Sequence, residues 1–204
     1  GSGVPEPRLY LLRHGHKAEG QWPNPAIGGH NDNPLSERGR AEAQAVAARL
    51  APLAPAEIWV SRYGRTTETA RPLVEALGLE PRLEPLLDEI DVGLTDQMDE
   101  AALARDYPDF MAAWKAWDRD FSYPGGESGA EVARRVAAVL EAVREGGRDV
   151  AAFSHDGFCR IAACVVLGLS PWERRRFRAD TCGLFEFEWA EARGRWEIVR
   201  LNAK

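Results

Sequence analysis

The chain is poor in cysteine. Its 204 residues include three, Cys159, Cys164 and Cys182, and no two of them form a C-x-x-C pair. An odd number of cysteines without paired spacing predicts neither a disulfide framework nor a zinc knuckle. A reducing compartment suits this usage, so we expect a cytoplasmic protein.

Long hydrophobic runs are also missing. The longest apolar stretch covers residues 161–169, far short of the roughly 20 residues that a membrane-spanning helix requires. The opening residues have only a short apolar run and no small-residue cleavage site, which argues against a signal peptide. We therefore expect no membrane partner. Residues 1–7, which begin Gly-Ser-Gly without a Met, are expected to lie outside the fold.

Positive charge is not in excess. The 26 Lys and Arg residues against 32 Asp and Glu residues give a net charge of −6, which argues against nucleic acid as a partner because such binding needs a basic face. An anion would have to bind in a local cationic pocket. With 45% hydrophobic and 28% charged residues, the composition is that of a globular protein and not of a disordered tail.

Internal repeats and Pro-, Gly- or Ser-rich linkers are absent, so residues 1–204 are expected to form a single domain. Apolar runs at residues 9–12, 57–61 and 149–154 predict strands, and each precedes a polar loop and a helical pattern. Helices are predicted at Glu37–Leu50 and at 158–167. Another helical stretch follows RYGRTTET and ends at Leu77, with Gly78 as its stop. Ser36 is the predicted N-cap of the first helix, with Ala41, Ala45, Val46 and Ala48 on its inner side.

Residues 99–120 also read as helical, with Trp114 and Trp117 on one face, and residues 90–125 are expected to form a cap-like helical insertion. A helix at 131–145 places Val132, Val136, Val139, Leu140 and Val143 toward the core. Alternation at 184–189 and 196–201 around Gly194 predicts a hairpin. The fold class expected is α/β, a three-layer sandwich with a mostly parallel central sheet and one antiparallel edge hairpin.

Polar residues follow three of the predicted strands. Ligands of α/β sheets bind beyond the carboxyl ends of the strands, and Arg meets a phosphate with two parallel hydrogen bonds. If these strands are neighbours, a pocket for a phosphoryl group results. The residues delivered there are Arg13, His14, Ser61, Arg62, Arg65, Ser154 and His155.

His14 has the position of a nucleophile in this pocket. A neutral imidazole nitrogen attacks phosphorus well when the other ring nitrogen is held by an acceptor. His14 could meet this condition by donating to a backbone carbonyl, with Gly15 letting the chain turn closely.

Six segments, taken in order, resemble the histidine phosphatase superfamily, the phosphoglycerate-mutase-like proteins, over about residues 9–183. They are LYLLRHG, NPLSERGRAEAQAVAARL, IWVSRYGRTTETA, LLDEIDVGLTD, YPGGES and FSHDGF. The resemblance implies that His14 becomes a phosphohistidine. It also implies that Arg13, Arg65 and His155 bind the phosphoryl group and that Glu89 is the general acid and base.

The chemistry of phosphoryl transfer agrees with these implied roles. Two guanidiniums and a protonated imidazole, that of His155, would stabilise the charge on the equatorial oxygens without a metal. An acid–base carboxyl should have a raised pKa. The residues alone do not choose among Asp88, Glu89 and Asp91; the resemblance selects Glu89.

The chain departs from the family where the substrate would lie. His16 and Lys17 follow the RHG triplet, Asp156 follows the late histidine, and Thr181-Cys182-Gly183 replaces a usual Asn-containing turn. The substrate is therefore not carried over from the family. His16, His30 and Arg62 are further candidates for contact with it.

We expect a metal-independent phosphomonoesterase that needs no cofactor and acts on a small-molecule phosphate ester, and a homodimer is left open. A mutase is the first alternative, although the chain clearly shows neither the additional cap sequence nor the tryptophan-asparagine signature after RHG that the family's mutases carry. A metal-dependent hydrolase using His14, His16, His30 and His155 with Asp156 is disfavoured because Arg13 and Lys17 would repel a dication. A phosphate binder without catalysis is the last alternative.

Overall fold

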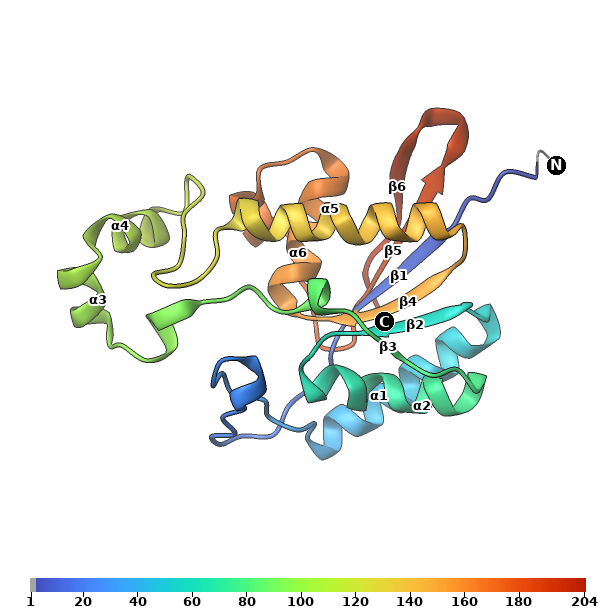
Figure 1. Cartoon of the computed structure of the whole chain (residues 1–204), viewed down its shortest axis with the longest axis horizontal. Helices are drawn as coiled ribbons and strands as arrows, with labels where there is room; N and C mark the ends of the chain where they lie inside the picture. The colour runs from blue at the N-terminus through green and yellow to red at the C-terminus, as the bar shows by residue number, and fades with distance from the viewer. Residues whose placement is uncertain (1–2) are drawn as a thin grey trace.

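The centre of the molecule is a six-stranded mixed sheet, seen in a computed structural model that describes residues 3–204 (Figure 1). Its strands are β1 (Arg8–Arg13), β2 (Glu57–Val60), β3 (Arg82–Leu83), β4 (Val150–Ser154), β5 (Leu184–Ala190) and β6 (Arg195–Ala203). In the order β3-β2-β4-β1-β5-β6, the first four are parallel, while β5 is antiparallel to β1 and to β6. The predicted mostly parallel sheet with an antiparallel edge hairpin is confirmed.

Helices cover both faces of this sheet (Figure 1). They are α1 (Glu37–Leu50), α2 (Gly64–Leu77), α3 (Glu100–Asp106), α4 (Pro108–Ala116), α5 (Gly129–Gly146) and α6 (Asp156–Leu167). The pair α1 and α2 packs on one face, and α5 and α6 pack on the other. The alternation of β1 explains the three layers, because Leu9 and Leu11 point to the α5–α6 side and Tyr10 and Leu12 to the α1–α2 side.

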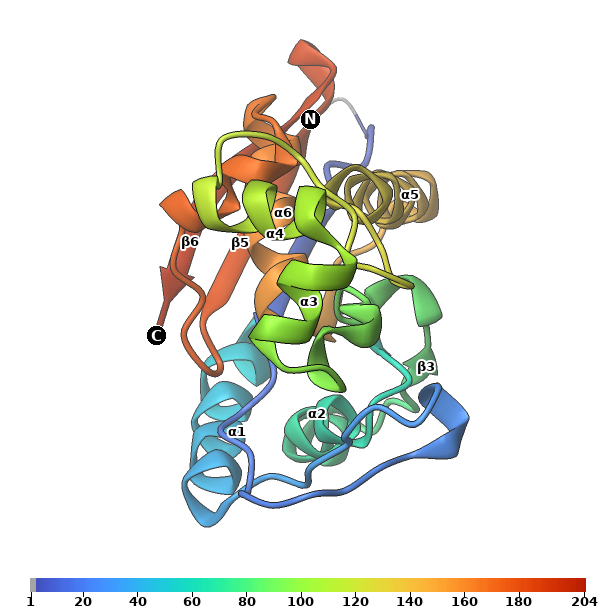
Figure 2. The ribbon, with the colours of Figure 1, turned by 90° about the vertical axis from the view of Figure 1, so that its left-hand side faces the viewer.

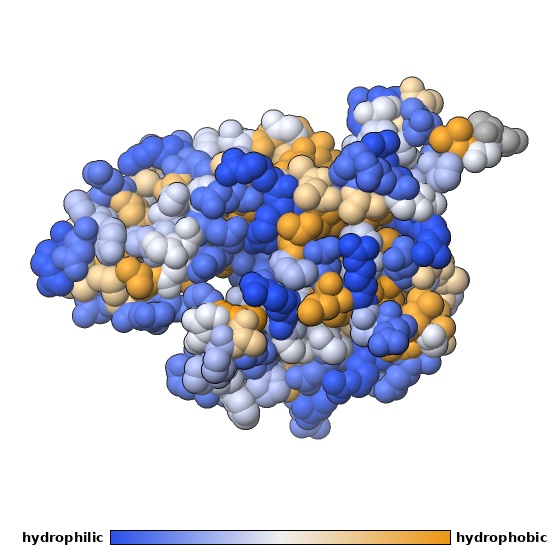
Figure 3. Space-filling model, viewed as in Figure 1, coloured by the Kyte–Doolittle hydropathy of each residue, from blue (hydrophilic) through white to orange (hydrophobic). Residues whose placement is uncertain are grey.

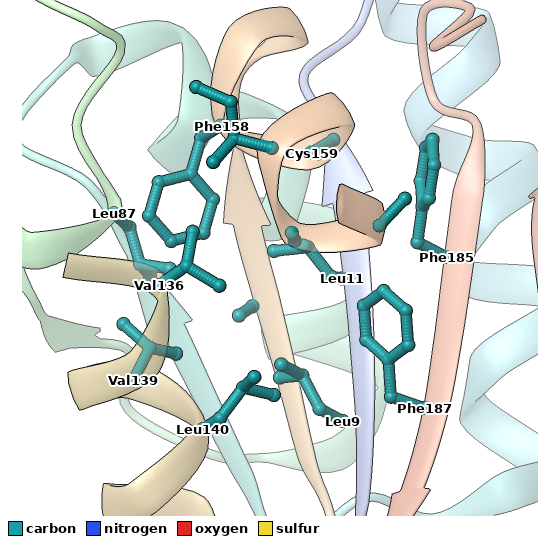
Figure 4. Close-up of a cluster of buried hydrophobic side chains, with 14 of the residues drawn as sticks. Leu9, Leu11, Leu87, Val136, Val139, Leu140, Phe158, Cys159, Phe185 and Phe187 are labelled. Atoms are coloured by element: carbon teal, nitrogen blue, oxygen red, sulfur yellow. The ribbon is translucent and has the colours of Figure 1, made fainter. Parts of the chain in front are cut away.

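The α5–α6 layer holds the larger core cluster. Figure 4 shows Leu140 of α5 beside Leu9, Val136 and Val139 of α5 near Leu87, and Phe185 and Phe187 of β5 on the other side of Leu9 and Leu11. The five core-facing residues predicted for α5 are all buried, which confirms that face of the helix. A stripe of branched residues at this spacing specifies one buried side without ambiguity.

The predicted inner face of α1 is wrong for its three alanines and correct for Val46. Ala41, Ala45 and Ala48 are exposed, whereas the buried residues are Gly39, Ala43, Val46, Ala47 and Leu50. Alanine stabilises a helix whether it is buried or exposed, and it buries little area. The buried face of α1 is therefore set by the larger Val46 and Leu50 at i and i+4. The predicted cap is correct, because Ser36 Oγ accepts a hydrogen bond from the Gly39 N–H.

The predicted helix at 99–120 is two short helices. Tyr107 leaves the helical region before Pro108, which lacks an N–H and restricts the residue before it. Trp117 takes a left-handed conformation with φ of 46° and ends α4, so it does not share a helix face with Trp114. This segment projects from the sheet around its own apolar cluster, which includes Leu103, Phe110 and Phe121. Figure 2 views it with α3 and α4 in front.

The expectation that residues 1–7 lie outside the fold is only partly met. Residues 1–2 lie outside the described residues, but Pro7 is buried and its carbonyl accepts a hydrogen bond from the Trp189 N–H. Across residues 3–204, the helices are too short or too polar to cross a membrane.

The close contact between α1 and the loop after β1 gives a test of the fold. A Cβ added at Gly39 would lie 2.0 Å from the His16 carbonyl oxygen. Gly39→Ala should therefore destabilise the protein by about 1–3 kcal/mol or more, as overpacking against backbone does. Gly146→Ala is the matched control, since a Cβ there meets nothing within 4 Å and a helical Ala should be neutral or stabilising by about 1 kcal/mol at most. Urea denaturation measures both, and equal midpoints would contradict the proposed contact.

Candidate active site

Three neighbouring strands end at the same edge of the sheet. Arg13 at the end of β1 pairs with Ser154 at the end of β4, and Val60 of β2 pairs with Phe153 of β4. The His14 N–H also donates to the Ser154 carbonyl over 3.0 Å. The predicted neighbourhood of the three strand ends is therefore confirmed, and it results from β4 lying between β1 and β2.

His14 is held in one tautomer by its own loop. Its side chain is buried, and Nδ1 lies 2.7 Å from the Gly15 carbonyl oxygen. Because a carbonyl can only accept, Nδ1 carries the proton and Nε2 keeps a free lone pair. Burial and the Arg65 guanidinium hold the pKa of His14 well below its usual value, so the ring is neutral at physiological pH.

Gly15 is required by packing and not by an unusual backbone angle. A Cβ at this position would lie 2.9 Å from the Gly39 carbonyl oxygen in the first turn of α1. The Gly15 N–H donates to Thr69 Oγ1 of α2 over 3.0 Å. The loop that carries His14 is thus fixed between α1 and α2.

Two arginines flank His14, and one nitrogen of each guanidinium finds no acceptor within residues 3–204. Arg13 Nη1 donates to the Ala179 carbonyl over 2.6 Å, and Arg65 Nη1 donates to the Asn31 carbonyl over 3.2 Å. The Nε atoms of both are buried and have no hydrogen-bond partner within the described chain. A buried donor left unpaired costs about 1–3 kcal/mol, so an anionic oxygen placed here would recover that energy.

His155 completes the cluster, with its ring 5.3 Å from that of His14 between centroids. Arg65 Nη2 donates to His155 Nδ1 over 3.4 Å, so the His155 proton is on Nε2, which donates to Ser61 Oγ over 2.8 Å. Burial and the neighbouring His14 lower the pKa of His155 well below its usual value. Burial and the surrounding positive groups thus favour a neutral His155 ring in the free site, and its expected protonation beside a phosphoryl group stays a prediction.

Glu89 reaches the site from the segment after β3. Its Oε1 accepts from the Ile90 N–H over 2.8 Å, and its Oε2 accepts from the Gly157 N–H at the start of α6 over 3.2 Å. Burial raises the pKa of Glu89, although the two backbone hydrogen bonds oppose the shift. This is the direction expected for a carboxyl that must hold a proton.

The neighbouring acids have other partners. Asp88 accepts hydrogen bonds from Arg62 Nε over 2.7 Å and from the Arg62 backbone N–H over 3.0 Å. Asp91 Oδ1 lies 3.2 Å from His30 Nε2. Glu89 alone of the three acids is bound by backbone N–H groups on two sides, and the tertiary structure thus distinguishes residues that the sequence did not.

The three further candidates for contact with the substrate, His16, His30 and Arg62, do not lie together. Arg62 is paired with Asp88, and His30 links the loop after β1 to the stretch before α3 through Asp91 and Asp96. His16 Nδ1 lies 2.7 Å from Ser36 Oγ at the start of α1. Arg62 and His30 both line a cavity beside Glu89, whereas His16 does not.

Arg135 of α5 is a site residue that the sequence reasoning missed. Its guanidinium donates to the Leu86, Asp88 and Glu89 carbonyls and to the Glu127 carboxylate, which fixes the backbone that presents Glu89. Nothing marks Arg135 in the sequence, because it looks like one more charge on an amphipathic helix.

Two cavities meet at Glu89. The first, which we call the acidic cavity, has about 360 Å³ and is lined by Asp88, Glu89, Asp91, Glu127, Arg62 and Arg135, among others. The second, the arginine cavity, has about 220 Å³ and includes Glu89, Asp156, Arg160, Arg174, Arg175 and Trp117. Figure 3 shows an indentation between the projecting α3–α4 segment and the loop after β1.

The proposed metal ligands do not converge. Within residues 3–204 no group of three or more His, Cys, Asp or Glu side chains is arranged to hold a metal ion. His14, His16 and His30 are each bonded to a different partner, Gly15, Ser36 and the Asp91–Asp96 pair respectively. The geometry thus gives the metal-dependent alternative no ligand set.

Known proteins resemble this chain over almost its whole length. A protein of Enterobacter sp. (strain 638) named "Probable phosphoglycerate mutase GpmB" is 31% identical over 189 residues, covering 91% of this chain and 86% of that protein. Mycobacterial glucosyl-3-phosphoglycerate phosphatase superposes with a TM-score of 0.76 at 26% identity, covering 97% of this chain and 99% of that one.

The α-ribazole phosphatase from Shigella flexneri shares the fold, with a TM-score of 0.77 at 22% identity over 96% of each chain. Residues 9–204 match the family model of the histidine phosphatase superfamily (branch 1). The site at the three strand ends and these matches lead to one conclusion: the chain belongs to the histidine phosphatase superfamily.

Proposed function

We propose that this member of a family of phosphatases and mutases hydrolyses phosphomonoesters of small molecules through a phosphohistidine on His14. The observation that carries the proposal is the hydrogen bond from His14 Nδ1 to the Gly15 carbonyl. It leaves Nε2 as a neutral nucleophile beside two buried guanidinium donors.

In the first step, His14 Nε2 attacks phosphorus and the bond from phosphorus to the ester oxygen breaks. In this mechanism Glu89 holds a proton, a state that burial favours by raising its pKa, and gives that proton to the leaving oxygen. Arg13 and Arg65 stabilise the charge on the equatorial oxygens in a site already arranged for it.

In the second step, water attacks the phosphorus of phospho-His14, and the phosphorus–nitrogen bond breaks. Glu89, now a carboxylate, takes a proton from that water. Inorganic phosphate leaves, and His14 recovers its lone pair. His155 is neutral before the substrate binds, and a phosphoryl oxygen near Nδ1 would favour its protonation.

Hydrolysis is favoured over mutase action by the surroundings of Glu89. A mutase must keep water from its phosphorylated intermediate, yet Glu89 lines two cavities here. The mutase reading is supported by the relatives named for that activity, so it is the second candidate.

Turnover of 3-phosphoglycerate with a trace of 2,3-bisphosphoglycerate separates the two activities. A phosphatase releases inorganic phosphate in proportion to the substrate consumed. Formation of 2-phosphoglycerate without phosphate release would instead identify a mutase. Nuclear magnetic resonance of ³¹P follows both products in one sample.

Substitution of His14 should remove turnover. His14→Asn keeps an N–H that can reach the Gly15 carbonyl but has no second ring nitrogen, so we expect a loss of at least about 10³-fold in kcat with generic aryl phosphates. In quenched reactions of the unmodified protein, base-stable and acid-labile phosphate should be found on His14. Substantial turnover by His14→Asn would overturn the nucleophile assignment.

The pH dependence of kcat/KM should be bell-shaped. His14 must be neutral, so activity rises as pH passes the lowered pKa of His14, and Glu89 must be protonated, so activity falls as pH passes its raised pKa. Glu89→Gln should cost about 10²–10⁴-fold and remove the alkaline limb.

The Glu89→Gln loss should be larger for an alkyl phosphate than for 4-nitrophenyl phosphate, because the nitrophenolate leaves without a proton. Equal losses for the two substrates would contradict the acid role of Glu89.

A further inference from the structure

The leaving group must lie beside Glu89 if Glu89 protonates it, because a general acid works within hydrogen-bond reach of its target. From that point two cavities that Glu89 lines are open to the rest of the substrate. The charge of each cavity therefore bears on what the substrate can be.

The acidic cavity does not suit an anion. Four carboxyl groups face two arginines and one histidine there. Both arginines are already bound: Arg62 to Asp88, and Arg135 to Glu127 and three backbone carbonyls.

The arginine cavity has the opposite character, with three arginines and two carboxyl groups. Asp156 pairs with Arg160, whose Nε lies 2.7 Å from Asp156 Oδ1. Arg174 and Arg175 form no ion pair with any acid in residues 3–204. Two positive charges in this cavity are therefore not neutralised by the described chain.

Of the three arginines, Arg174 gives the strongest indication that this cavity binds a ligand. It is 5% exposed, Nη1 donates to the Pro171 carbonyl, and Nη2 is buried with no hydrogen-bond partner within the described chain. A buried guanidinium nitrogen left unpaired is costly unless a bound group satisfies it.

Trp117 holds the two arginines in place. The guanidinium carbon of Arg175 lies 3.5 Å from the Trp117 ring centroid and that of Arg174 lies 4.7 Å from it. Trp117 Nε1 donates to the Trp172 carbonyl over 2.5 Å. The projecting segment is thus joined to the segment after α6 at the point where both arginines face the cavity.

We propose that the arginine cavity binds a second anionic group, a carboxylate or a phosphate, on the leaving group of the substrate. Arg174 and Arg175 are its principal donors, and their guanidiniums offer the paired N–H groups that oxyanions prefer. This inference rests on the proposed function, since it places the leaving group beside Glu89. It defines the substrate class as small phosphomonoesters with a second negative charge.

Binding measured without turnover tests this inference. In the His14→Ala protein, calorimetry would compare 3-phosphoglycerate with glycerol 3-phosphate, which replaces the carboxylate by a neutral group. A second pair, 1,3-propanediol bisphosphate and its monophosphate, tests a phosphate. We expect the anionic member of at least one pair to bind about 10- to 100-fold more tightly, and the pair that shows this identifies the group.

The same ratio should fall about tenfold or more when Arg174→Gln or Arg175→Gln is added. Arg175 is exposed, so its variant should fold even if the Arg174 variant does not. Arg176→Gln is the matched control, because Arg176 is the next residue, is exposed and pairs with Glu173 outside the cavity; its ratio should not change. Ratios near one for both pairs, or ratios unaffected at Arg174 and Arg175, overturn the inference.

Hydrolysis of 4-nitrophenyl phosphate by the unmodified protein separates the two proposals. No hydrolysis would overturn the proposed function, while the binding ratios would still decide whether the arginine cavity takes an anion. Hydrolysis together with flat binding ratios would retain the proposed function and remove the inference.

Discussion

The parallel hydrogen bonding of β4 to β1 on one side and to β2 on the other is the constraint on which the site depends. It brings together three strand ends that lie about 50 and 90 residues apart in the chain. The loops after these strands then face each other, and the His14 N–H is tied directly to the end of β4 through the Ser154 carbonyl. A shift of one residue in either register would turn the side chains of the central strands to opposite faces, so the core and the site are specified together.

The site concentrates positive charge in a protein whose net charge is −6. Arg13 and Arg65 stand beside two histidines, and burial together with these positive charges lowers the pKa of both imidazoles, so that both rings are neutral in the free enzyme. In the proposed mechanism this neutral state suits His14, because only the neutral ring is a nucleophile. The same charge cluster is costly until an anion enters, and the unpaired Nε atoms of the two arginines are consistent with a site arranged for the transition state and not for the free protein.

In the proposed mechanism, Glu89 stands between the phosphoryl group and the rest of the substrate. Its carboxyl is held by the Gly157 N–H at the start of α6, and its backbone carbonyl is held by Arg135 of α5. Beyond it, the projecting α3–α4 segment and the segment after α6 supply the walls of the arginine cavity. A family fold can therefore keep one reaction while the charge of a neighbouring cavity changes the substrate, because the two depend on different loops.

The sequence by itself determined features that depend on neighbours along the chain: the α/β architecture, the Ser36 cap and the buried stripe of α5. It also suggested a His14 that donates to a backbone carbonyl, and the structure identifies that carbonyl as the one of Gly15. The sequence did not determine the face of α1, where the alanines carry little information, or the break at Pro108, where one residue outweighs a helical pattern. Tertiary structure alone decided that Arg62 is neutralised by Asp88, that Glu89 faces α6, and that His155 is neutral. It also brought Trp117, Arg174 and Arg175 to one cavity. The reason is that periodicity and capping act over a few residues, whereas ion pairing, burial and pKa depend on which distant groups share the same space.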